Sequence, residues 1–115
     1  MKSTAALTLA VLLTPAVAVA FEGSYALQGL DADKSAYSGT VEVLKSGAGY
    51  QIRWVVDGAT AFGAGMLDGE TLWVGYVDEG RAGVTAMKKQ ANGDLKGPWY
   101  RRGGKALGEE SWIKK

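Results

Sequence analysis

The chain has 115 residues, with 13 basic and 12 acidic side chains, a net charge of +1, and neither histidine nor cysteine. This length suits one domain. The lack of cysteine excludes disulfide bonds, thiol nucleophiles and lipid attachment to a cysteine, and the lack of histidine removes the commonest general base and a common transition-metal ligand.

Residues 1–20 have the layout of a secretory signal peptide. A basic start is followed by an apolar run over residues 5–13, a break at Pro15 and three small residues that end at Ala20. We expect cleavage after Ala20, so that residues 21–115 form the exported domain, in the periplasm or outside the cell. The apolar run is shorter than the about 20 residues that span a bilayer, and no other run approaches that length, so the sequence predicts no membrane span.

From residue 21 onward, apolar and polar residues alternate in short segments separated by glycine-rich turns, a pattern typical of β-strands. In the clearest segment, Ile52 and Trp54 fall on one face and Arg53 on the other. The connections between segments are short, so successive strands should pair in an antiparallel meander. Eight strands are predicted, over residues 22–28, 37–45, 50–57, 60–67, 70–77, 82–90, 95–102 and 107–113.

Eight short strands in one domain must protect their edges, and closing the sheet into a barrel does so. The sequence therefore predicts an all-β fold, a small closed or nearly closed β-barrel. Gly63, Gly65 and Gly75 are expected to face its interior, where they leave room for coiling or for a facing aromatic ring. Pro98 cannot donate to a ladder, so we expect a bulge or an open seam in its strand. The strands are too short for an outer-membrane barrel.

The interior of an eight-stranded barrel is just wide enough to be filled by side chains or to hold one small ligand. Six aromatic residues are expected there, and two interpretations stay open: a packed core, or the lining of a pocket for a small apolar ligand. These residues are Tyr50, Trp54, Trp73, Tyr76, Trp99 and Trp112.

The charges are unevenly distributed. Residues 21–80 hold three basic and nine acidic side chains, and residues 81–115 hold nine basic and three acidic ones. Either the two halves neutralise each other across neighbouring strands, or the basic half offers a surface to an anionic partner. The candidate partners are an extracellular matrix protein, an anionic glycan or lipopolysaccharide, and nucleic acid is not expected for an exported chain. The candidate outer-face residues are Lys88, Lys89, Lys96, Arg101, Arg102 and Lys105.

No group of residues points to catalysis or to a metal. The carboxylates fall mainly in turns, as at Asp57 and Asp78, where solvated acidic groups are ordinary. Residues 31–42 place acidic or polar groups at several positions of a calcium loop, but Ala36 stands where the sharp turn needs glycine. We therefore expect no enzyme activity, no metal and no cofactor.

Six glycine-rich and aromatic motifs are spread over most of residues 22–112: Tyr37-Ser-Gly-Thr-Val-Glu-Val, Gly49-Tyr-Gln-Ile-Arg-Trp, Gly63-Ala-Gly, Leu72-Trp-Val-Gly-Tyr, Gly93-Asp-Leu-Lys-Gly-Pro-Trp and Gly108-Glu-Glu. Together they resemble a family of small exported bacterial β-proteins, often labelled fibronectin-binding proteins and similar in outline to calycin barrels. The resemblance implies a barrel and an adhesion or binding role, and it carries no residue-level binding motif.

These observations lead us to expect an exported, non-enzymatic binding module that uses its outer face. Two alternatives stay open. One is a lipocalin-like carrier that holds a small apolar ligand in the barrel interior, and the other is a periplasmic inhibitor of a hydrolase.

Overall fold

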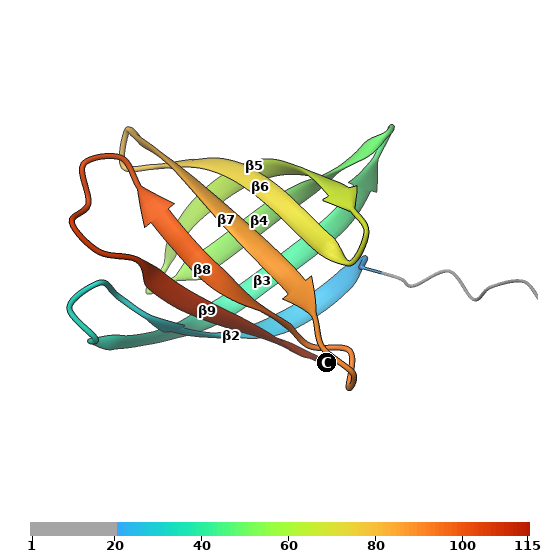
Figure 1. Cartoon of the computed structure of the whole chain (residues 1–115), viewed down its shortest axis with the longest axis horizontal. Helices are drawn as coiled ribbons and strands as arrows, with labels where there is room; N and C mark the ends of the chain where they lie inside the picture. The colour runs from blue at the N-terminus through green and yellow to red at the C-terminus, as the bar shows by residue number, and fades with distance from the viewer. Residues whose placement is uncertain (1–20) are drawn as a thin grey trace, which may run out of the picture.

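A computed structural model describes residues 21–115. These residues form a closed barrel of eight antiparallel strands and contain no helix (Figure 1). The strands are β2 (Gly23–Leu30), β3 (Ala36–Ser46), β4 (Gly49–Val56), β5 (Ala59–Asp68), β6 (Thr71–Asp78), β7 (Arg81–Lys89), β8 (Leu95–Arg101) and β9 (Gly108–Lys114). Each strand pairs with the next, and β9 pairs with β2 to close the barrel. The predicted eight-stranded meander is confirmed, and no boundary differs from its prediction by more than two residues. The predicted signal peptide lies outside the described residues.

The connections alternate between the two ends of the barrel. The end at the left of Figure 1, here called the open end, carries the β2–β3 and β8–β9 loops and the two-residue turns Asp57-Gly58 and Glu79-Gly80. All four turn residues have positive φ angles between 51° and 78°, as type I′ hairpin turns require. The opposite end, here called the closed end, carries the β3–β4, β5–β6 and β7–β8 connections and the C-terminus.

The closed end is filled by side chains, because strand alternation turns every second residue inward. Phe21, just before β2, caps this end: its ring centroid lies 6.5 Å from that of Tyr50, and its carbonyl accepts a 2.6 Å hydrogen bond from the Tyr25 hydroxyl. Lys89 Nζ lies 4.9 Å from the centroid of the Phe21 ring. The buried core consists of Phe21, Tyr25, Leu27, Val41, Val43, Ile52, Trp54, Leu72, Val74, Met87, Leu95 and Trp112.

Strand β6 corrects two predictions about the interior. Leu72 and Val74 are buried, so their neighbours Trp73 and Gly75 face outward, and the Trp73 side chain is 50% exposed. The predicted interior positions of Trp73 and Gly75 are therefore wrong. The other two glycines do face inward: a β-carbon at Gly63 would lie 3.0 Å from Trp54 Cζ3.

Strand β8 contains Pro98, and the ladder between β7 and β8 is interrupted at Ala86 and Met87. Pairing continues in the same register on both sides of this gap, so no residue bulges out, and Pro98 itself pairs with β9. Thr85 Oγ1 donates a 2.8 Å hydrogen bond to the Pro98 carbonyl, which links the two strands across the gap. The predicted bulge or open seam is therefore wrong, because the missing donor interrupts one ladder without opening the barrel.

Gly97, in the same gap, allows β7 and β8 to approach closely, since a β-carbon there would overlap the carbonyl oxygen of Ala86. We predict that Gly97→Ala lowers the free energy of unfolding by about 1–3 kcal/mol, because backbone rather than a flexible side chain must move. Gly75→Ala is the matched control, since nothing lies within 4 Å of a β-carbon at that strand position. Urea denaturation followed by tryptophan fluorescence measures both, and equal stabilities would contradict the close approach.

Candidate functional site

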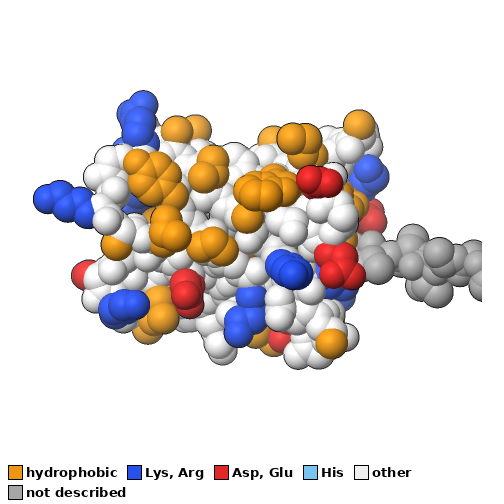
Figure 2. All heavy atoms as spheres, in the orientation of Figure 1, with side chains coloured by type: hydrophobic (Ala, Val, Ile, Leu, Met, Phe, Trp, Pro, Cys, Tyr) orange, Lys and Arg blue, Asp and Glu red, His pale blue; other side chains and the backbone are white. Residues whose placement is uncertain are grey.

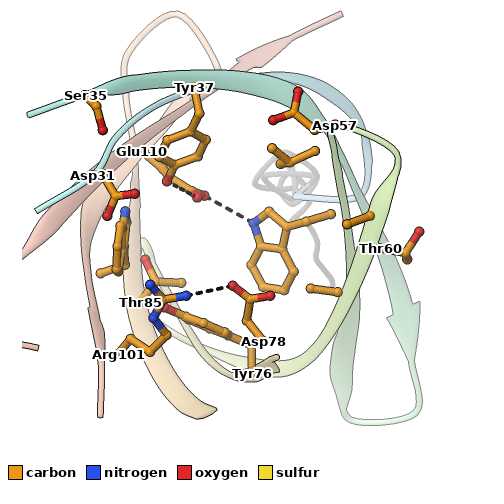
Figure 3. Close-up of a pocket in the computed structure, with 15 residues that line it drawn as sticks. Asp31, Ser35, Tyr37, Asp57, Thr60, Tyr76, Asp78, Thr85, Arg101 and Glu110 are labelled. Carbon is orange, nitrogen blue, oxygen red and sulfur yellow. Dashed lines mark hydrogen bonds and ion pairs between the residues drawn. The ribbon is translucent and has the colours of Figure 1, made fainter. Parts of the chain in front are cut away.

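A cavity of about 300 Å³ lies inside the barrel and opens at the open end (Figure 3). In this view, Glu110 and Tyr37 point toward each other on one side, and Asp78 and Arg101 meet on the other. Four aromatic and five charged side chains line the cavity: Tyr37, Trp54, Tyr76 and Trp99, and Asp31, Asp57, Asp78, Arg101 and Glu110.

Three of the four aromatic rings lie over a glycine of the neighbouring strand. At each of these glycines a β-carbon would overlap the ring, so the ring fits against the barrel wall only because the side chain is absent. Such pairing of an aromatic residue with a cross-strand glycine is a known device for fixing register. Here it also keeps the rings out of the lumen. The directly opposed pairs are Tyr37 with Gly29, Tyr76 with Gly83, and Trp99 with Gly108.

Glu110 accepts three hydrogen bonds. Tyr37 donates its hydroxyl to Oε2 at 2.6 Å, and the indole nitrogens of Trp54 and Trp112 donate to Oε1 at 3.1 Å and 2.8 Å. Burial raises the pKa of the Glu110 carboxyl, and the three hydrogen bonds act in the opposite direction. Burial also raises the pKa of Tyr37, with a further contribution from the Glu110 charge. All three donors are uncharged, so they do not offset a charge on this carboxyl group.

Arg101 and Asp78 form an ion pair across the opposite wall, with Nη1 and Oδ2 3.0 Å apart. The Arg101 guanidinium also lies 5.9 Å from the centroid of the Trp99 ring. Burial raises the pKa of the nearby Tyr76 hydroxyl to about 12. Two enclosed donors in this wall, Arg101 Nε and Trp99 Nε1, have no hydrogen-bond acceptor in suitable geometry among the described residues.

The six aromatic residues predicted for the interior divide into three groups. Trp54, Tyr76 and Trp99 line the cavity, as one of the two open interpretations expected. Trp112 lies beneath it in the core and Tyr50 packs against Phe21 at the closed end, which fits the other interpretation. Trp73, as described above, is on the outer face.

The six basic residues predicted for one outer surface are not brought together. Lys88 and Lys96 oppose each other on exposed faces of β7 and β8, whereas Lys89 lies over the Phe21 ring at the closed end. Arg101 lines the cavity, so its predicted place on the outer face is wrong: it lies two residues from Trp99 and shares its inward face. The remaining two, Arg102 and Lys105, are exposed in the β8–β9 loop.

The most distinctive feature of the outer face is apolar rather than basic. Phe62 and Met66 on β5 oppose Val77 and Trp73 on β6, and all four side chains are at least half exposed. Figure 2 shows hydrophobic side chains gathered over the upper part of the barrel in this view, whereas charged side chains are scattered over the lower part and around the edges.

Five of the nine aromatic and charged residues that line the cavity were not predicted as site residues: Asp31, Tyr37, Asp57, Asp78 and Glu110. Strand alternation contained a signal for the last of them, because Glu110 lies two residues before Trp112 and therefore shares its face. No local signal marks Tyr37, whose partner Glu110 is 73 residues away.

The part of the chain that the structure describes has no group of three or more acidic, histidine or cysteine side chains placed to hold a metal ion. Within residues 21–115, no helix is long and apolar enough to cross a bilayer. No protein-family model matches the chain, and no curated protein matches its sequence. The function is therefore inferred from geometry and chemistry alone.

The raised pKa of Glu110 predicts a pH dependence of stability. Above the ordinary glutamate value of 4.5, the folded protein keeps a proton that the unfolded chain has lost, so this residue contributes progressively less stability as pH rises. We expect the unfolding free energy of the wild type, minus that of Glu110→Gln, to fall as the pH rises above the ordinary glutamate value of 4.5. Urea denaturation at a series of pH values measures it. Glu109→Gln, which removes the exposed neighbouring carboxylate, is the control, and an equal slope for both variants would contradict the assignment.

Proposed function

We propose that this protein is a non-enzymatic binding protein that holds one small ligand in the open end of its barrel. The observation that carries the proposal is the cavity whose aromatic walls lie over glycines. Side chains of an eight-stranded barrel are large enough to fill its interior, yet three large rings lie against the wall and leave about 300 Å³ between them. That volume is at the lower end of the range of small-molecule sites.

The polar groups of the cavity favour binding over catalysis. Both oxygens of Glu110 accept hydrogen bonds, and Asp78 is ion-paired, so neither carboxylate is positioned as an unengaged general base.

Binding through the outer face, to a matrix protein or an anionic glycan, remains a separate prediction, as does inhibition of a hydrolase. The basic residues on which outer-face binding rested lie at the closed end, on the outer wall, in the cavity and in a loop. This dispersal makes the interior the better-supported site.

Filling the cavity tests the proposal. Ala61 lies on β5 opposite Trp54 and lines the cavity, whereas Ala64 on the same strand is exposed. We expect Ala61→Phe to weaken ligand binding at least about tenfold by occupying the space, while Ala64→Phe leaves binding unchanged. Tryptophan fluorescence and native mass spectrometry against a library of small molecules measure saturable one-to-one binding.

Two results would count against the interior site. One is the absence of any saturable complex, and the other is a complex whose affinity Ala61→Phe does not change, since such a ligand binds elsewhere. Urea denaturation of both alanine variants establishes that each is folded before binding is compared.

A further inference from the structure

The charged side chains that line the cavity are mostly acidic. Four carboxylates face a single guanidinium, that of Arg101, and Arg101 is already paired with Asp78. No lining cation remains to offset Glu110 inside the cavity, or Asp31 and Asp57 at its rim. Three hydrogen bonds favour the ionised form of Glu110, but their donors carry no net charge and do not offset the charge of that form.

The aromatic side chains, like the carboxylates, favour a positively charged group in the cavity. Tyr37, Tyr76 and Trp99 each pack against a glycine of the neighbouring strand, and all three rings line the cavity. Aromatic faces carry negative potential and attract a cation within about 6 Å of the ring centre. Arg101 already lies in this way over Trp99, so this wall accommodates a cation.

Resting on the proposed function, we propose that the ligand is a small organic cation: a protonated amine or a quaternary ammonium group held among the rings of Tyr37, Trp54 and Tyr76, next to Glu110. This class satisfies the aromatic faces and the unbalanced carboxylates together. A neutral apolar ligand would desolvate Glu110 further without compensating its charge, and an anionic ligand would face four carboxylates with only the paired Arg101 to attract it.

The test compares the affinities of cationic, neutral and anionic ligands, including one pair of the same shape. Choline and 3,3-dimethyl-1-butanol differ in having a quaternary nitrogen or a carbon at the same position. We expect choline and the larger benzyltrimethylammonium ion to bind the wild-type protein at least about tenfold more tightly than the neutral alcohol. Phenylacetate serves as the anionic probe and is expected not to bind. Isothermal titration calorimetry measures all four.

Variants of cavity residues test where the cation binds. Glu110→Gln is expected to weaken cation binding about tenfold. Tyr76→Leu is expected to weaken it about fivefold, whereas Tyr76→Phe, which keeps the ring over Gly83, retains it. Asp68→Asn is the control, because this exposed carboxylate lies next to the β5–β6 turn at the closed end and should not affect affinity.

The outcomes separate this inference from the proposed function. Equal or tighter binding of the neutral alcohol or of phenylacetate overturns the cation inference, and it leaves the proposed function intact if Ala61→Phe abolishes that binding. If neither cation binds while neutral library molecules occupy the cavity, the cation inference is likewise overturned and the proposed function is left intact. The absence of any saturable ligand overturns both. The choline comparison uses the unaltered protein, so it stands even if a variant does not fold.

Discussion

The cavity depends on the packing of aromatic rings against glycines of neighbouring strands. At the closed end, Phe21 and the buried core fill the barrel in the usual way for eight strands. At the open end, a β-carbon at Gly29, Gly83 or Gly108 would push the opposing ring away from the wall and into the lumen. Three positions without side chains therefore determine whether this half of the barrel is filled or hollow. The same packing places the three rings in the lining of that space.

Glu110 joins this site to the core. Two of its three donors, Trp54 and Trp112, are core residues whose rings also contact each other, with centroids 6.0 Å apart. The carboxylate is consequently held by groups that the closed end of the barrel already fixes, so its position requires little further ordering when a ligand arrives. Burial and hydrogen bonding oppose each other at this residue. The net effect, a raised pKa, identifies it as a carboxylate for which a positive charge in the cavity would be favourable.

Alternation and turn chemistry were sufficient to predict the strands and the closed meander from the sequence, but the site required stricter use of the two-residue period. Trp73 and Tyr76 are three residues apart on one strand, so both cannot face inward, and Trp99 and Arg101 are two apart, so both must share a face. Those placements followed from the sequence. The contact between Tyr37 and Glu110 did not, because it depends on β9 closing against β2 in one particular register. Long-range register and ring orientation are set by packing that local patterns do not encode.

The connections at the open end divide the rim of the cavity into two unlike halves. Asp57 lies in the two-residue turn after β4, and Asp78 is the last residue of β6, directly before the second such turn. The residues of both turns have a left-handed backbone, which few other sequences adopt. The β2–β3 and β8–β9 loops are longer, and they flank the paired strands β2 and β9, of which β9 carries Glu110. Loops tolerate changes in length and sequence that strand pairs do not. Changes in these two loops would therefore alter the entrance beside Glu110, including the charge of Asp31, whereas the ring-bearing strands would keep the shape of the cavity constant.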